Sequence, residues 1–156
     1  MNKNFSRLLP AALLLLVVTW YGCKKETPLT LAPEEAHFMN KASGSYFITA
    51  PGVTYKLPIG LTTVSDVDRT VKISVTSPTG AVEGTHYTLS NTSLTIPAGK
   101  VIDTLVITGD YAQYTAGRKD TLVFTIEGVD KGGVASSSYN SQFKLFMRGP
   151  CSEAEL

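Results

Sequence analysis

The stretch VTYKLPIGL at positions 53–61 decides the fold, because aliphatic and aromatic side chains stand at every second position in it. The residues at these alternate positions share one face of an extended chain: Val53, Tyr55, Leu57, Ile59 and Leu61. A period of two predicts a half-buried β-strand. Pro58 falls on the outward register and has no N–H to donate, so it predicts that this strand lies at a sheet edge or carries a bulge.

The same period of two recurs along the chain from residue 36 onward. The inward side chains of the further strands are predicted to be Val71, Ile73 and Val75; Tyr87 and Leu89; Leu94 and Ile96; Val101, Leu105 and Ile107; Leu122, Phe124 and Ile126; and Phe143, Leu145 and Met147. Turns rich in Pro and Gly separate the strands, at 51–52, 78–80, 97–99 and 132–133. Because no helical window and no βαβ crossover competes, the pattern predicts an all-β fold, an antiparallel sandwich of about seven strands.

The N-terminus has the organisation of an export signal. Lys3 and Arg7 precede an apolar run from Leu8 to Thr19. A helix of about 12 residues spans only about 18 Å, well short of a hydrocarbon core of about 30 Å, so an ordinary membrane span is excluded. We therefore expect residues 1–22 to be removed on export.

The motif Trp20-Tyr21-Gly22-Cys23 at the end of this signal resembles a lipobox, with a small residue directly before the cysteine. Trp20 stands where a lipobox usually has an aliphatic residue, a relaxation similar to that of Bacteroidetes-type lipoproteins. We expect Cys23 to carry the lipid that anchors the chain. A plain secreted protein and a chain held by an uncleaved signal are the alternatives.

Acylation of Cys23 would place the protein in the cell envelope, and we expect the outer membrane, on its periplasmic or its surface side. One acyl chain binds a membrane only reversibly, whereas the two or three chains of a bacterial lipoprotein hold it firmly. Residues 23–35, with Pro28 and Pro33, are predicted to form a flexible tether. The sandwich is expected over residues 36–148, followed by a C-terminal tail over residues 149–156.

Cys151 is the second of the two cysteines. If Cys23 is acylated, Cys151 has no partner within the chain and stays a free thiol in an oxidising compartment. A Cys23–Cys151 disulfide is the alternative for a chain without a lipid.

The charge of the chain is close to zero. The formal net charge is +1, and the loss of Lys3 and Arg7 with the signal leaves 12 basic residues against 13 acidic ones. Binding to nucleic acid depends on a gathered basic surface, and Lys and Arg are scattered here. We therefore exclude nucleic acid as a partner.

Three segments closely resemble the Calx-beta module: Glu83-Gly84-Thr85-His86-Tyr87, Leu94-Thr95-Ile96-Pro97-Ala98-Gly99 and Leu105-Val106-Ile107. The resemblance covers roughly residues 36–147 and implies an immunoglobulin-like sandwich. Modules of this family in sodium/calcium exchangers bind Ca²⁺ through clustered carboxylates, which the resemblance would place before the tyrosine and in the loop 110–120.

Most of those carboxylates are absent from this chain. His86 stands where the family carries Asp, and the loop 110–120 offers Asp110 beside Arg118 and Lys119. Ca²⁺ needs six to eight oxygen ligands, usually with several carboxylates among them. Asp66 and Asp68 form a second weak candidate, although aspartates in a turn are more often turn formers. We therefore expect no tight calcium site and no cofactor.

No set of residues predicts catalysis. His37 and His86 lack any metal-ligand spacing, and Ser136-Ser137-Ser138 has no nucleophile motif. Glu83 and Glu127 would need to face one cleft to act as a glycosidase pair. We therefore interpret the domain as a non-catalytic module.

Two functions remain open for such a module. It could be a structural or adhesive domain that presents its loops to a protein partner, or an accessory glycan binder of a polysaccharide-uptake system. Tyr111, Tyr114 and Tyr139 in predicted loops suit either role. Clustering of their rings on one face would favour the glycan function, and scattering would favour the scaffold.

Overall fold

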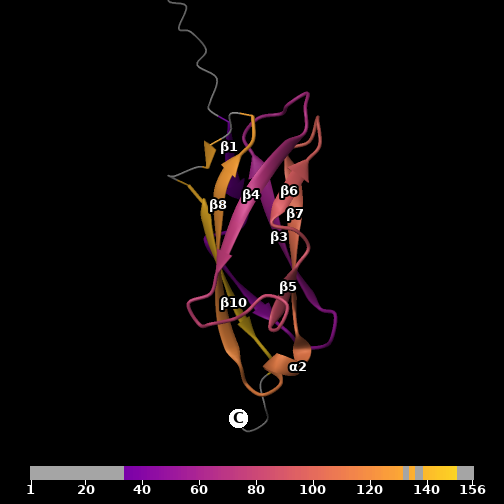
Figure 1. Ribbon diagram of the computed structural model, residues 1–156, viewed down its shortest axis with the longest axis vertical. Helices are drawn as coiled ribbons and strands as arrows, with labels where there is room; N and C mark the ends of the chain where they lie inside the picture. Colours follow the sequence, from indigo (N-terminus) through magenta and orange to yellow (C-terminus); the bar gives the residue numbers. More distant parts are fainter. Residues whose placement is uncertain (1–33, 132–133, 136–138, 151–156) are drawn as a thin grey trace, which may run out of the picture. The chain divides into compact units, whose positions relative to one another are not determined.

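The computed structural model describes residues 34–131, 134–135 and 139–150, which form a sandwich of two β-sheets (Figure 1). Its elements are β1 (Glu35–Phe38), β2 (Ser43–Phe47), β3 (Thr54–Leu61), β4 (Arg69–Thr76), β5 (Tyr87–Leu89), β6 (Ser93–Ile96), β7 (Ile102–Gly109), α2 (Tyr111–Tyr114), β8 (Lys119–Val129), β9 (Val134–Ala135) and β10 (Gln142–Arg148). One sheet has the order β5-β7-β3-β1-β9, and the other has the order β2-β10-β8-β4-β6.

The predicted all-β sandwich is confirmed, and each alternating run forms a strand. All the side chains predicted to face inward are buried or half-buried. The described residues hold more strands than predicted, ten, because β1, β2 and β9 are too short or too polar to show a period of two. The one-turn helix α2 was also not predicted. Among the described residues, no helix has the length and apolarity needed to cross a membrane.

The N-terminal part of the sandwich changes sheet. β1 pairs antiparallel with β3 and parallel with β9, whereas β2 pairs parallel with β10 in the other sheet. Two parallel pairs therefore interrupt an otherwise antiparallel fold. β1 begins at Glu35, and the Glu34 carboxylate already contacts Arg69, so ordered contacts begin two residues before the predicted boundary at residue 36.

The prediction that Pro58 marks an edge strand is wrong, because β3 lies between β7 and β1. The carbonyl of Pro58 accepts a hydrogen bond from the N–H of Met39, one residue past the end of β1. Carbonyl and N–H of one strand residue point to the same side. An N–H at position 58 would point toward Met39, where β1 has already ended. Because β1 offers no pairing partner there, the missing N–H of Pro58 costs no hydrogen bond between β3 and β1.

A buried tyrosine ties the two sheets together. The hydroxyl of Tyr46, on β2, donates to the carbonyl of Val53 and accepts a hydrogen bond of 3.1 Å from the N–H of Gly109, on β7. Its ring lies 5.9 Å from that of Tyr55, and the ring of Tyr55 lies 6.1 Å from that of Phe143. A buried hydroxyl is costly unless it is hydrogen-bonded, and here one hydroxyl serves both as donor and as acceptor.

Candidate functional site

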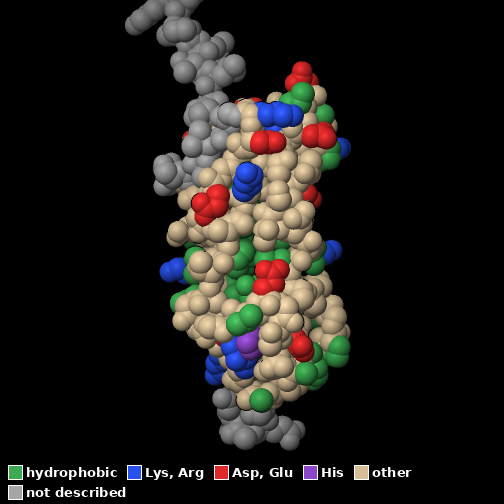
Figure 2. Space-filling model, viewed as in Figure 1, with side chains coloured by type: hydrophobic (Ala, Val, Ile, Leu, Met, Phe, Trp, Pro, Cys, Tyr) green, Lys and Arg blue, Asp and Glu red, His purple; other side chains and the backbone are tan. Residues whose placement is uncertain are grey.

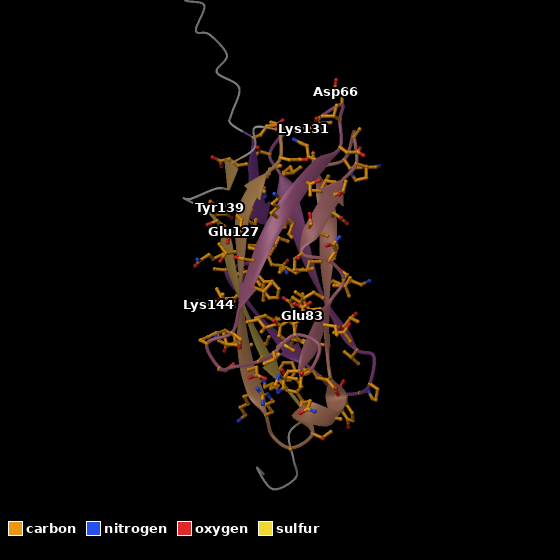
Figure 3. All side chains as sticks on the ribbon, viewed as in Figure 1. Asp66, Glu83, Glu127, Lys131, Tyr139 and Lys144 are labelled. Atoms are coloured by element: carbon orange, nitrogen blue, oxygen red, sulfur yellow. The ribbon has the colours of Figure 1, made fainter. Side chains whose placement is uncertain are left out.

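The three tyrosines predicted as binding-loop aromatics do not form one surface. Tyr114 is fully buried and belongs to the core, so its prediction as a loop contact is wrong. Tyr111 is half-buried against the core, and Tyr139 is 67% exposed. Tyr139 lies toward the upper end of the molecule (Figure 3), and α2, with Tyr111 and Tyr114, lies at the lower end (Figure 1). The rings are therefore scattered, which excludes a site built from these loop tyrosines and by itself favours the scaffold over the glycan binder. A glycan site, if the domain has one, must lie on another surface.

The carboxylates considered as weak metal ligands are also separated. Asp66 lies at the upper end (Figure 3), and Asp110 caps α2 at the lower end by accepting from the N–H of Ala112. Asp68 accepts a hydrogen bond of 2.9 Å from the N–H of Ala98. Within residues 34–131, 134–135 and 139–150, no group of three His, Cys, Asp or Glu side chains could hold a metal ion.

His86 has a structural role at the position where the family carries Asp. Its Nδ1 accepts a hydrogen bond of 2.9 Å from the N–H of Val82, and its own N–H donates to the carbonyl of Val82. These bonds close the turn that leads into β5. His86 thus shapes the backbone at this position.

Glu83 and Glu127 do not face one cleft. Figure 3 shows Glu127 toward the upper left of the molecule and Glu83 lower down, near its middle. Glu127 is on β8 and accepts a hydrogen bond from the hydroxyl of Ser74, whereas Glu83 lies in the connection between β4 and β5. The glycosidase arrangement considered for this pair is therefore wrong.

The outer face of β2, β10 and β8 carries the most distinctive exposed side chains. Phe47 and Phe146 are 45% and 46% exposed, although they are large aromatic residues. Arg148 lies between Phe47 on β2 and Lys119 on β8, and its guanidinium carbon stands 4.2 Å from the centre of the Phe47 ring. Such a cation–π contact holds the planar guanidinium over the ring.

The next row of this face is Ser45, Phe146 and Thr121, on the same three strands. An open pocket of about 390 Å³ lies over both rows, lined by Ser45, Thr79, Lys119, Asp120, Thr121, Phe146, Met147 and Arg148. It combines one exposed aromatic ring, two cations and three hydroxyl groups. We call this surface, made of Ser45, Phe47, Lys119, Thr121, Phe146 and Arg148, the outer-sheet site.

A buried carboxylate supports the outer-sheet site from below. Asp120 accepts hydrogen bonds from the Tyr114 hydroxyl at 2.8 Å, from the Thr79 hydroxyl at 2.9 Å, and from Arg118 Nε at 2.6 Å and Nη2 at 3.2 Å. Burial alone would raise the pKa of Asp120, but these donors, Arg118 first, outweigh it and lower the pKa. Burial raises the pKa of Tyr114, and its hydrogen bond to Asp120 raises it further. The network therefore stays ionised at Asp120 and neutral at Tyr114 near pH 7.

The charges on the rest of the visible surface are dispersed. On the face that Figure 2 shows, acidic and basic side chains are interspersed at the upper end, and basic side chains form only small groups elsewhere. No extended basic surface of the kind that nucleic acid needs is present on that face.

The sequence contained a signal for one aromatic residue of the outer-sheet site, Phe146. Because Phe143, Leu145 and Met147 face the core, the period of two places Phe146 outward, and an aromatic ring at an outward position is unusual. Phe47 could not be found in this way, because the sequence of β2, SGSYF, has no clear period of two. Nothing in it indicates that β2 leaves the sheet of β1 and pairs with β10.

Comparisons with known proteins agree with the predicted Calx-beta-like fold. No family model matches the chain, and no curated protein matches it. Among solved structures, the chain is similar to the apo form of the Calx CBD1 domain, with 9% identity and a TM-score of 0.61 over 77% of this chain and 100% of that domain. These values show a shared Calx-beta-like, immunoglobulin-like sandwich.

Two proteins of Bacteroides species have similar folds. One is a candidate carbohydrate-binding protein from Bacteroides ovatus, with 19% identity and a TM-score of 0.53 over 75% of this chain. The other is a two-domain protein of unknown function from Bacteroides fragilis, with 10% identity and a TM-score of 0.51 over 76% of this chain. The chain spans only 37% and 46% of the lengths of these two proteins. These three similar structures are binding domains or proteins of unknown function, and none of them is described as an enzyme.

Proposed function

We propose that this protein is a non-catalytic glycan-binding module of the cell envelope, that the outer-sheet site is its ligand surface, and that a lipid on Cys23 anchors it. The observation that carries the glycan function is the exposure of Phe47 and Phe146 on one sheet face, at 45% and 46%. Exposed aromatic rings leave apolar area in water unless a ligand covers them. The flat C–H face of a sugar ring is such a ligand.

The polar side chains around Phe146 fit the same ligand. Ser45 and Thr121 flank it on the neighbouring strands, and Thr79 closes one wall of the pocket. A few convergent hydroxyl groups beside an aromatic ring can orient a small ligand by hydrogen bonds. The similarity to a candidate carbohydrate-binding protein from Bacteroides ovatus supports this choice.

The experiment that tests the ligand surface is glycan pull-down with detergent-extracted full-length protein. Phe146→Ala should lower retention on polysaccharide columns at least tenfold, because a stacking ring is lost. Ile102→Ala is the matched control, since Ile102 is 49% exposed on the other sheet and should leave retention unchanged. Equal retention of both variants, or capture of a protein partner through Phe146 without any glycan retention, would overturn the glycan function.

The proposal of lipid anchoring rests on the order of the N-terminal sequence, since Cys23 lies outside the described residues. A charged start, an apolar run, Gly22 and then Cys23 follow in the order that lipoprotein export requires. Two or three acyl chains would hold the domain at the membrane, and we propose the outer membrane as its location.

Intact-mass analysis of membrane-extracted protein tests the anchor. The expected mass is that of residues 23–156 with acyl chains, and Cys23→Ala should move the protein from the membrane to the soluble fraction. Protease treatment of whole cells then distinguishes the surface from the periplasm. A native protein that retains Met1 at its N-terminus would contradict the proposed anchor.

A further inference from the structure

The cations of the outer-sheet site surround its exposed aromatic ring. Arg148 follows Phe146 by two residues on β10, and Lys144 precedes it by two, so all three side chains stand on the same outward face. Lys119 lies directly opposite Arg148 on β8. Residues two apart on a strand are about 7 Å apart and neighbouring strands about 4.8 Å apart, so these groups lie within reach of one or two sugar units.

Acidic side chains are nearly absent from this face. Among the described residues of β2, β10 and β8, Glu127 is the only acid at an outward position. It lies beyond the pairing of Gln142 with Thr125 at the far end of β10, and it accepts a hydrogen bond from Ser74. Figure 3 shows it above Lys144, toward the upper end of the molecule.

Asp120, the only acid among the described residues that line the pocket, is paired with Arg118 and not with Arg148. Its side chain is 2% exposed, and both of its oxygens already accept hydrogen bonds, two of them from Arg118. The two ion pairs among the described residues are Arg118–Asp120 and Arg69–Glu34. Within this part of the chain, Arg148 and Lys144 therefore have no acidic partner.

Arg148 is also held in a geometry suited to a carboxylate. Stacking on the Phe47 ring at 4.2 Å restricts the guanidinium plane and leaves its N–H edge available. A guanidinium donates two parallel hydrogen bonds to one carboxylate or sulfate, and a held guanidinium loses less conformational entropy when it does so.

We infer that the outer-sheet site selects acidic glycans, in which a uronic acid carboxylate or a sulfate binds Arg148 while the sugar ring packs on Phe146. The inference rests on the proposed glycan-binding function and adds the class of ligand. Lys119 and Lys144 supply further positive charge on either side of Phe146, so binding weakens as salt screens the charges. The sugar ring and the anion are recognised by neighbouring side chains of one strand.

The test is calorimetric titration of detergent-extracted full-length protein with three acidic polysaccharides: polygalacturonate, alginate and chondroitin sulfate. Each is paired with its neutral counterpart, made by carboxyl reduction and, for the last, desulfation. At least one acidic member should bind ten times or more tightly than its neutral partner. Its affinity should fall severalfold between 50 and 300 mM NaCl, a range over which the Debye length falls to less than half.

Variants localise the effect. Arg148→Ala should lower the affinity for the acidic polysaccharide at least tenfold, and Arg148→Lys should recover only part of it, because an ammonium cannot form the paired hydrogen bonds. Lys56→Ala is the control, since it removes an exposed cation from the outer face of β3 in the other sheet and should change the affinity less than twofold.

The outcomes separate the two proposals. Equal binding of acidic and neutral partners that is lost in Phe146→Ala overturns the selectivity for acids and leaves the glycan-binding function standing. Acid-selective binding that is unchanged in Arg148→Ala overturns the assignment to this site. Binding of no polysaccharide, whether from the three pairs or from the columns described above, overturns both proposals.

Discussion

The hydroxyl of Tyr114 donates a hydrogen bond of 2.8 Å to Oδ2 of Asp120, which joins the one-turn helix α2 to β8 beneath the outer-sheet site. Both groups are almost completely buried, at 0% and 4% exposure. Sequence alone predicted a loop tyrosine here, and the structure instead shows a donor to a buried charge. Hydrogen bonds to charged groups contribute more to stability than neutral ones do.

Tyr114→Phe should therefore lower the free energy of unfolding by about 1.5–3 kcal/mol, the usual contribution of a hydrogen bond to a charged group. The ring still fills its place, so the loss reports the hydroxyl alone. Urea denaturation, followed by circular dichroism, measures the free energy of unfolding. Tyr111→Phe, at the other end of α2, is the control and should change the value by less than about 0.5 kcal/mol. Equal effects of the two substitutions would contradict the role given to the Asp120 network.

Because of Asp120, the free energy of unfolding should depend on pH in the acidic range. Its pKa in the folded state lies below the ordinary value of 3.8, so the folded state binds the proton less readily than the unfolded chain. The stabilisation is fully present above about pH 4 and is lost as the pH falls from there through the folded pKa. Asp120→Asn should be less stable than the native protein at pH 7, and the difference should shrink toward pH 2. Denaturation curves at several pH values measure this, and a constant difference would contradict the ionised state of Asp120.

The strands of the core could be predicted from the sequence because burial on one face forces a period of two. Leu57, Ile59 and Leu105, for example, are fully buried where alternation places them. The short strands could not be found, since β2 is SGSYF and its pairing depends on β10, about a hundred residues away. Such long-range pairing leaves no local pattern.

The candidate site was harder to predict than the fold. Tyr114 was predicted to be a loop residue available for binding, but it ends one turn of helix and its side chain lies in the core. Phe146 could be placed outward by alternation, whereas its neighbours across the sheet, Ser45 and Thr121, are set by register. A site that spans three strands is therefore visible only once their pairing is known.

The ion pair between Glu34 and Arg69 should stabilise the start of the sandwich. The guanidinium of Arg69 is 1% exposed and donates to Glu34 at 3.2 Å and to the carbonyl of Thr63 at 2.5 Å. Glu34→Gln keeps the size of the side chain but leaves a buried cation without its anion. The expected loss is about 1–2 kcal/mol, at the low end for a buried pair because the Glu34 side chain is 33% exposed.

Urea denaturation again measures this loss, and Glu35→Gln is the matched control. Glu35 is the next residue, and its described hydrogen bonds are made by its backbone: its N–H donates to the Thr62 hydroxyl, and its carbonyl accepts from the N–H of Thr62. Its substitution should change the free energy of unfolding by less than about 0.5 kcal/mol. If the two variants lose the same stability, the loss comes from removing one negative charge from this region, and the role given to the Glu34–Arg69 pair is contradicted.

Gly149 should be the least replaceable of the glycines beside the outer-sheet site, because a Cβ there would meet the backbone carbonyl oxygen of Tyr114 at 2.1 Å. A backbone oxygen cannot rotate out of the way as a side chain can. Gly149→Ala must therefore displace either α2 or the end of β10 that carries Arg148. The expected loss of stability is about 1–3 kcal/mol, as for other overpacked sites.

Gly128→Ala is the control, since its Cβ meets nothing within 4 Å and its backbone is not left-handed. Thermal unfolding measures stability, and ligand titration measures the displacement of Arg148. An alanine tolerated at 149 as well as at 128 would contradict the close packing of α2 against the end of β10.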